Sequence, residues 1–269
     1  MLNRTQPVGG LLREWRQRRR LSQLDLACDA GISTRHLSFV ETGRAHPNRD
    51  MLLHLSEQLD VPVRERNVLL VAAGYAPIFP ERPLADPVMA AARAAIDLVL
   101  EGQKPYPAFA LDRHWTIVAS NAALPELYDN VAADLLAPPV NAMRLSLHPQ
   151  GLAPQIVNLA EWRAHLLHRL RHQVELTADR ALIDLLREVS AYPAPAEKPG
   201  QVAGLEHDIA VPFQIETGGD VLSFFSMTTV FGTPVDVMLS ELALELFFPA
   251  DQETAAAVTR MAVRAGAAN

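Results

Sequence analysis

The stretch SQLDLACDAGISTRHLSFVETG, residues 22–43, decides the fold of the amino-terminal part of the chain. Ser22 and Asp25 have the spacing of a capping box, which predicts the start of a short helix. Gly31 is the residue type that adopts positive φ without strain, so it predicts the end of this helix and a sharp turn. Ser33 then predicts the cap of a second helix. The stretch therefore predicts two short helices joined by a tight turn.

The second of these helices is amphipathic. Leu37, Phe39 and Val40 predict its buried face. The opposite face carries short polar side chains and one arginine, at Thr34, Arg35, His36 and Ser38. The major groove of B-DNA accepts a helix with such a surface, so these residues are candidates for reading base edges, and Arg35 suits the O6 and N7 atoms of guanine. Contact with phosphate alone is the alternative for each of them.

The stretch is similar to the helix-turn-helix of the phage-repressor (Xre) type. The resemblance is carried by Leu21-Ser22-Gln23, Leu26-Ala27, Gly31-Ile32-Ser33, Leu37-Ser38, Glu41 and Gly43. It implies a five-helix domain that binds double-stranded DNA; the alternative is a small helical bundle without this role. It also implies further DNA contacts by residues that flank the second helix, namely Gln23, Ser33, Arg44, Asn48 and Arg49.

The charge of the chain is divided unevenly. The 269 residues carry a formal net charge of −7, but residues 1–80 hold eleven arginines against eight acidic residues. Residues 81–269 hold thirteen basic residues against twenty-three acidic ones. The positive charge therefore collects beside the candidate DNA-binding helices, and the asymmetry predicts two parts with separate tasks.

Several classes of function are disfavoured. The chain lacks an apolar run long enough for a membrane span and an apolar leader at its start, so we expect no membrane insertion and a cytoplasmic location. Its one cysteine, Cys28, fits a reducing compartment and is expected to be buried. No G-x-S-x-G, P-loop or G-x-G-x-x-G motif is present, so we expect no catalytic residues and no enzyme fused to the helix-turn-helix.

Three histidines, at His165, His168 and His172, have the spacing of neighbouring helical turns. Such spacing could present two imidazoles to a metal ion. The polar side of an amphipathic helix explains the same pattern, so we expect no metal site.

The remainder of the chain predicts a second domain. Residues 77–87 hold four prolines and predict a stiff connector, and an apolar helix at 88–100 is expected to lie between domains or in a dimer seam. Strands are expected at 107–111, 115–120, 207–216, 221–231 and 241–248, with helices between the second and third. This order is typical of a PAS-like sensor, which has a five-stranded antiparallel sheet with helices on one face. We expect an α+β fold with a helix-turn-helix domain at 1–76, a linker and connecting helix at 77–104 and a PAS-like domain at 105–269.

Over nearly its whole length the chain resembles the MmyB-like transcription regulators. Besides the helix-turn-helix, the resemblance is carried by Gly74-Tyr75-Ala76-Pro77, Trp115-x-x-Val118-Ala119-x-Asn121-Ala122-Ala123 and Leu246-Phe247-Phe248-Pro249-Ala250-Asp251. In that family the C-terminal domain is implicated in binding a fatty acid. The resemblance implies a sequence-specific transcription regulator whose DNA binding is modulated by a long-chain fatty acid or similar apolar ligand. One helix-turn-helix offers few contacts, so we also expect a homodimer that reads two half-sites.

The C-terminal domain has an excess of apolar side chains. Either they pack into a solid core, which would make the chain a DNA-bound adaptor with a protein-interaction module, or they surround an apolar ligand. The family resemblance favours the ligand. Candidates for its apolar contacts are Trp162, Phe213, Phe224, Met227 and Leu244, and candidates for holding a carboxylate head are Arg144, His148, Arg169 and His172.

Overall fold

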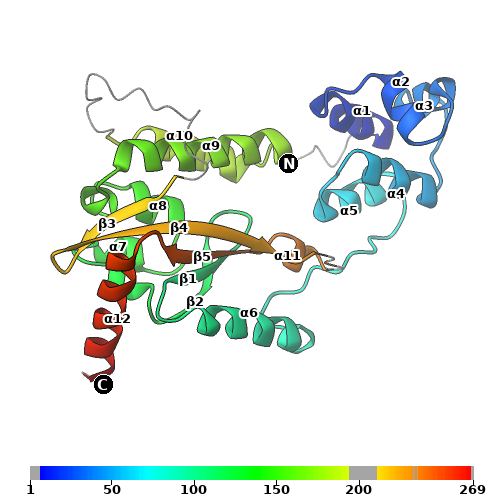
Figure 1. The fold of residues 1–269 in the computed structure, drawn as a ribbon. Helices are drawn as coiled ribbons and strands as arrows, with labels where there is room; N and C mark the ends of the chain where they lie inside the picture. Colours follow the sequence, from blue (N-terminus) through cyan, green and yellow to red (C-terminus); the bar gives the residue numbers. More distant parts are fainter. Residues whose placement is uncertain (1–6, 194–210, 233, 235, 268–269) are drawn as a thin grey trace. The chain divides into compact units, whose positions relative to one another are not determined.

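The computed structural model describes residues 7–193, 211–232, 234 and 236–267 (Figure 1). The chain forms two compact units. The N-terminal unit holds Met1–Arg82 with residues 175–179 and 233–240, and the C-terminal unit holds residues 83–174, 180–232 and 241–269. The proline-rich connector therefore contains the boundary between them.

The N-terminal unit begins with the five expected helices. They are α1 (Val8–Arg18), α2 (Gln23–Asp29), α3 (Thr34–Glu41), α4 (Arg49–Gln58) and α5 (Val63–Ala72). Their apolar faces meet in one core, built around Leu11, Leu12, Trp15, Leu26, Leu37, Leu52, Leu55, Leu69 and Leu70. Cys28 is exposed, contrary to our expectation, because Leu26 and Ala27 occupy the buried side of α2.

The C-terminal unit contains a five-stranded antiparallel sheet. Its strands are β1 (Ala108–Leu111), β2 (Ile117–Ser120), β3 (Phe213–Thr217), β4 (Asp220–Val230) and β5 (Ala243–Pro249). They lie in the order β2-β1-β5-β4-β3, and the expected α+β class is confirmed. Residues 207–210 of the expected third strand lie outside the described residues.

Helices surround this sheet. The longer ones are α6 (Ala90–Gly102), α9 (Leu159–Thr177), α10 (Arg180–Ser190) and α12 (Gln252–Ala267). Shorter segments of this unit are η1 (Pro87–Met89), η2 (Pro125–Leu127), α7 (Ala133–Leu136), α8 (Ala142–Leu147) and η3 (Ala153–Gln155), whereas α11 (Val237–Ser240) belongs to the N-terminal unit.

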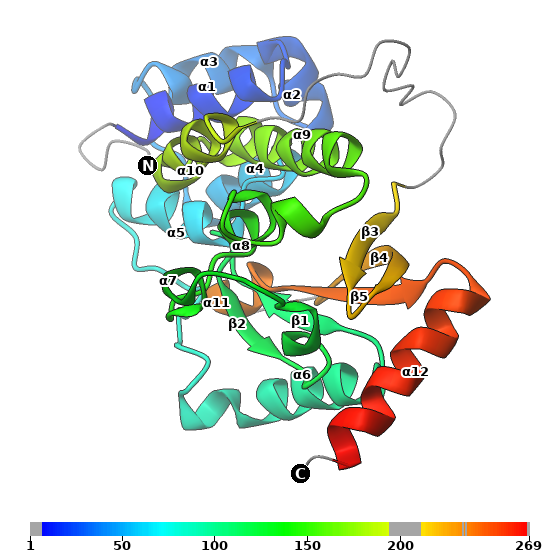
Figure 2. The ribbon, with the colours of Figure 1, turned by 90° about the vertical axis from the view of Figure 1, so that its left-hand side faces the viewer.

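Helices cover both faces of the sheet, so the expectation of helices on one face was wrong. In two views α9 and α10 lie on one side of the strands and α6 on the other (Figures 1 and 2). The small side chains of Ala108 and Ala110 are fully buried in β1 next to α6, which lets the helix approach the strand closely. Ile96 and Leu100 are the buried residues of α6, whereas Leu98 remains 74% exposed.

Strand β5 is central in the sheet, and the residues that it turns towards the cavity differ from those predicted from the sequence. Leu244 was a candidate for contact with the ligand, which would place Leu244 and Leu246 on the cavity side of the strand. Instead Glu245 and Phe247 line the cavity described below, so the leucines take the opposite face. A central strand with both faces covered carries apolar residues on each, and alternation alone therefore does not identify the functional face.

Two asparagines organise the segment between β1 and α8. The Oδ1 atom of Asn121 accepts from the Ala108 amide, and its Nδ2 donates to the carbonyls of Leu100 and Tyr106. Asn141 caps α8, a helix that the sequence analysis did not predict, by accepting from the amide of Arg144 at 3.2 Å.

Candidate functional site

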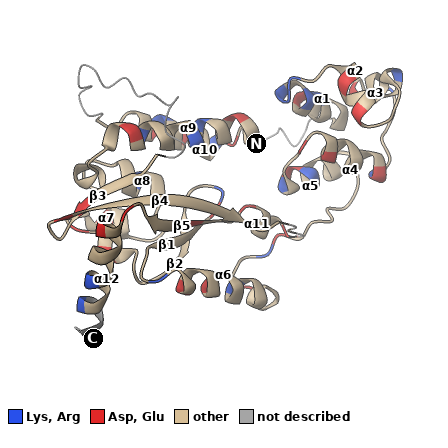
Figure 3. Cartoon of the chain, in the orientation of Figure 1, with Lys and Arg blue, Asp and Glu red and all other residues tan. Residues whose placement is uncertain are grey.

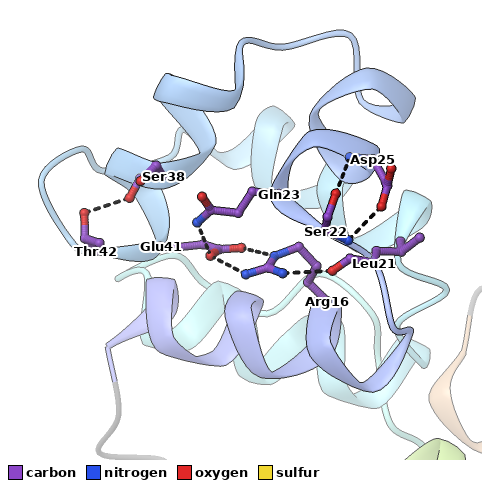
Figure 4. Close-up of polar contacts among 8 residues, drawn as sticks. All are labelled: Arg16, Leu21, Ser22, Gln23, Asp25, Ser38, Glu41 and Thr42. Atoms are coloured by element: carbon purple, nitrogen blue, oxygen red, sulfur yellow. Dashed lines mark hydrogen bonds and ion pairs between the residues drawn. The ribbon is translucent and has the colours of Figure 1, made fainter.

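The helix-turn-helix is held by the local interactions that its sequence predicted. The Ser22 hydroxyl accepts from the Asp25 amide at 3.1 Å, and the Asp25 carboxylate accepts from the Ser22 amide at 2.8 Å (Figure 4). These hydrogen bonds lower the pKa of Asp25. Gly31 has a φ of 62°, and Ser33 caps α3 by accepting from the amide of His36.

A buried ion pair fixes the angle between α1 and α3. Arg16 Nε and Nη2 donate to the two carboxylate oxygens of Glu41 at 2.6 and 2.9 Å, and Arg16 Nη1 donates to the Leu21 carbonyl (Figure 4). The hydrogen bonds to Glu41 raise the pKa of Arg16. Gln23 Nε2 donates to the same carboxylate at 2.7 Å. The pair therefore also orients the side chain expected to clamp the DNA backbone.

The arginines of α1 have separate roles. Arg16 is buried in the ion pair, and Arg19 donates to the carbonyls of Leu59 and Asp60 beyond the end of α4. Arg13 and Arg20 are exposed. At least two of the arginines thus serve the fold.

The outward face of α3 presents the expected polar residues. Arg35 and Ser33 are exposed, while Thr34, His36 and Ser38 are half-buried. The Arg35 guanidinium carbon lies 5.3 Å from the centre of the Phe39 ring, and that of Arg44 lies 5.9 Å from the same ring.

Beyond α3, Arg44, Asn48 and Arg49 are all exposed. The Asn48 side chain caps α4 by accepting from the Met51 amide at 2.8 Å. The N-terminal helices carry residues of both signs of charge (Figure 3), so the arginines around α3, rather than the whole unit, form the candidate DNA interface.

The C-terminal unit holds an apolar cavity between the sheet and the helices. Its empty volume, including its open mouth, is about 630 Å³. The lining residues are Phe109, Leu111, Trp115, Ile117, Leu124, Leu127, Tyr128, Ala142, Met143, Leu145, Ser146, Leu152, Trp162, Leu166, Arg169, Phe213, Glu245 and Phe247. Sixteen of these eighteen residues are uncharged, so the cavity suits an apolar molecule.

Aromatic rings form one wall of the cavity. The ring of Phe213 lies 5.0 Å from that of Trp162 and 5.7 Å from that of Phe247, measured between centres. Trp162 Nε1 donates to the Ser146 hydroxyl at 3.0 Å, which satisfies its buried N–H. The rings are therefore fixed by one another and by a hydrogen bond to α8.

Two charged side chains meet in the cavity wall. Arg169, from α9, donates through Nη2 to Glu245 Oε1 at 2.5 Å. The Thr228 hydroxyl donates to the same oxygen at 3.0 Å. The Arg169 guanidinium also lies over the Trp115 ring, 5.0 Å from its centre. Sequence analysis missed Glu245, because its place between Leu244 and Leu246 is that of a residue on the polar face of an alternating strand.

Comparison with known families agrees with this arrangement. A family model described as the MmyB-like transcription regulator ligand binding domain matches residues 92–261, and one described as helix-turn-helix matches residues 12–66. The chain belongs to the MmyB-like transcription regulators. As a member of that family it is a DNA-binding regulator with a ligand-binding domain, and neither family model describes an enzyme. A search of the curated proteins found no match.

Three ligand-binding residues predicted for this MmyB-like protein come together in the cavity wall: Trp162, Arg169 and Phe213. Arg144 lies outside the lining and pairs with Glu188 at 2.7 Å. His148 packs its ring against Tyr192, with 5.0 Å between the ring centres.

The remaining predicted residues also lie outside the lining. Phe224 is fully buried and packs edge-on against Phe247, one layer behind the cavity. Leu244 is on the face of β5 opposite Glu245. Met227 is 60% exposed, and His172 is exposed on α9.

Neither a metal site nor a membrane-spanning helix is found in the described part of the chain. No group of three or more potential ligands among its His, Cys, Asp and Glu residues could hold a metal ion. His165 stacks on Trp162, and burial lowers its pKa. None of the described helices is both long and apolar enough to cross a bilayer.

Proposed function

We propose that this regulator binds a long-chain fatty acid or similar apolar molecule in its C-terminal domain, and that the ligand modulates its binding to operator DNA. In this proposal the domain works as a PAS-like sensor in a cytoplasmic protein without catalytic activity. The observation that carries the proposal is the cavity, whose wall is apolar except at Arg169 and Glu245. In an interaction module with a solid core, side chains would fill the space between the sheet and the helices.

The energetics favour a chain-shaped ligand. Each buried methylene contributes about 0.8 kcal/mol, so a long acyl chain binds tightly with few polar contacts. The volume open to water-sized molecules inside the cavity is about 70 Å³, so a long chain would extend through the open mouth of the cavity. Modulation requires that the ligand bind with different affinity to the DNA-bound and free states.

The ligand is tested by extracting the purified full-length protein and analysing the extract by mass spectrometry. We expect an acyl lipid, and we expect lipid-free protein to be stabilised by added dodecanoic acid or dodecanamide. Ala142→Leu fills part of the cavity and should weaken this stabilisation, whereas Ala160→Leu, at an exposed position of α9, should leave it unchanged. A lipid-free preparation that responds to neither compound would refute the proposal.

We further propose a homodimer, since one helix-turn-helix makes too few base contacts for a specific operator. Leu98 and Val99 on α6, and Val88 just before it, are exposed apolar residues that could be buried between two copies of the chain, which supports a dimer. Sedimentation with and without DNA tests this. A monomer that protects a single half-site would contradict it.

A further inference from the structure

Glu245 is a buried carboxylate in an otherwise apolar cavity, and its residue is only 3% exposed. Within the described chain, Arg169 and Glu245 are the only charged members of the cavity wall. Burying a carboxylate is costly unless it is paired, and here Arg169 supplies the opposite charge. The cavity therefore has a polar end that is already neutral before any ligand arrives.

We propose that this neutral pair makes the cavity select chains with an uncharged head that both donates and accepts hydrogen bonds, such as a primary amide, over the ionised carboxylate of the same chain. The inference rests on the proposed binding of an apolar chain. It assigns to Glu245 the role of a residue that determines head-group specificity.

The unused hydrogen-bonding atoms of the pair define the head group. Glu245 Oε1 accepts from both Arg169 Nη2 and the Thr228 hydroxyl. Within the described residues, Glu245 Oε2 accepts no hydrogen bond, and Arg169 Nε and Nη1 donate none. An amide can donate its N–H to the free oxygen and accept at its carbonyl from the free guanidinium nitrogens.

An ionised carboxylate fits the same atoms poorly. It can accept from Arg169 but has no proton to donate to Glu245 Oε2, and the two carboxylates repel each other. It also adds a second negative charge beside Glu245, whereas an amide leaves the site neutral. The charge balance therefore opposes the carboxylate at the position where the amide makes two hydrogen bonds.

Other contacts fix the position of the Arg169 side chain, so it does not break its ion pair with Glu245 to bind a ligand carboxylate elsewhere. Its guanidinium lies over the Trp115 ring, and Trp115 Nε1 donates to Gln173 Oε1 at 2.8 Å. Trp115 itself has a φ of 67°, in a turn where the Asp112 carboxylate accepts from the amides of His114 and Thr116 at 2.8 Å. This framework keeps the cation beside Glu245.

The test compares dodecanamide with dodecanoate at neutral pH, by calorimetry on lipid-free full-length protein. Wild type should bind the amide about tenfold more tightly, the effect of one satisfied hydrogen bond to a charged group. Glu245→Gln removes the resident negative charge and leaves Arg169 free for the ligand, so it should reverse the order. Glu188→Gln removes a carboxylate that pairs with Arg144 outside the cavity and should preserve the wild-type order.

The outcomes separate this inference from the proposed function. Failure of both compounds to bind refutes the proposed function. Binding of dodecanoate as tightly as dodecanamide to the wild type overturns the selectivity while leaving ligand binding intact. The wild-type comparison requires no substitution, so it decides the question even if Glu245→Gln does not fold. An unchanged preference for the amide in folded Glu245→Gln would also overturn the assignment to Glu245.

Discussion

Arg16 and Glu41 form a two-pronged ion pair, with N–O distances of 2.6 and 2.9 Å, although they lie 25 positions apart in the sequence. The Glu41 side chain is 1% exposed and that of Arg16 is 10% exposed. One belongs to α1 and the other to the last turn of α3, so the pair fixes the helix that carries Arg35.

Glu41→Gln should destabilise the N-terminal unit by about 3–5 kcal/mol, because it leaves the buried Arg16 without its counter-charge. Urea unfolding with hydrogen exchange at the α1 and α3 amides measures this loss. Glu57→Gln is the matched control: Glu57 is 61% exposed and lies 3.7 Å from Arg66, so its loss should cost less than about 1 kcal/mol. Equal effects of the two substitutions would contradict the role of the buried pair.

Gly9→Ala should also destabilise this unit, through a direct clash. A Cβ at Gly9 would lie 2.2 Å from the Val40 carbonyl oxygen and 2.8 Å from that of Glu41. Backbone atoms cannot move aside, so we expect a loss of about 2 kcal/mol or more in the same unfolding experiment. Gly102→Ala, which meets nothing within 4 Å, should be neutral or slightly stabilising. If Gly9→Ala were as stable as the wild type, helices α1 and α3 would be able to move apart to make room for the Cβ, contrary to this prediction.

Arg35→Ala should weaken binding to the preferred operator by about 5- to 150-fold and relax the choice of base at one position, as expected for loss of a guanine contact. Operator sequences selected in vitro, followed by anisotropy titrations on selected and scrambled duplexes, measure both effects. Equal weakening on both duplexes would assign Arg35 to phosphate instead.

Arg44→Ala is expected to behave differently from Arg35→Ala. A phosphate contact contributes equally on all sequences, so its loss should weaken binding uniformly and reduce the salt dependence by about one unit of slope. Titrations at several salt concentrations measure that slope. An unchanged slope together with altered sequence preference would place Arg44 among the base-reading residues.

Arg144→Gln should raise the pKa of Glu188 towards its ordinary value, because the hydrogen bond from Arg144 is the largest cause of its lowering. A carboxyl with a lowered pKa in the folded state contributes stability above its unfolded pKa, and this contribution disappears as the pH falls through the folded value. Both side chains are partly exposed, so the loss at pH 7 should stay below about 1 kcal/mol. Carbon-detected NMR titration of Glu188 measures the pKa, and Arg187→Gln, in a separate exposed pair, should leave it unchanged. If the pKa of Glu188 were the same in Arg144→Gln as in the wild type, the pairing of Glu188 with Arg144 would be contradicted.

The helix boundaries of the helix-turn-helix were predictable because their causes are local. Ser22, Ser33 and Asn48 each cap the helix that follows them, and Gly31 ends α2 with positive φ. Each of these signals involves atoms within a few residues of one another. The strands and their order along the chain were also predictable from apolar alternation. Helix α8, which Asn141 caps, was not predicted.

The site in the C-terminal domain was predicted less well, because it depends on contacts between distant segments. Trp162, Arg169 and Phe213 lie in the cavity wall, whereas Arg144 pairs with Glu188 outside it. Glu245 was missed, since an acidic residue between two leucines gives no sign of the face that will be buried.

The sequence by itself determined the two short helices and their turn, the polar face of α3, the uneven charge of the two parts and the five strands, because propensity, capping and periodicity act over neighbouring residues. Only the tertiary structure decided that Arg16 meets Glu41, that Gly9 lies against the end of α3, and that Glu245 rather than the adjacent Leu244 faces the cavity. These relationships arise when helices and strands distant in sequence pack together, and burial then determines which side chains must be paired and which positions have no room for a Cβ.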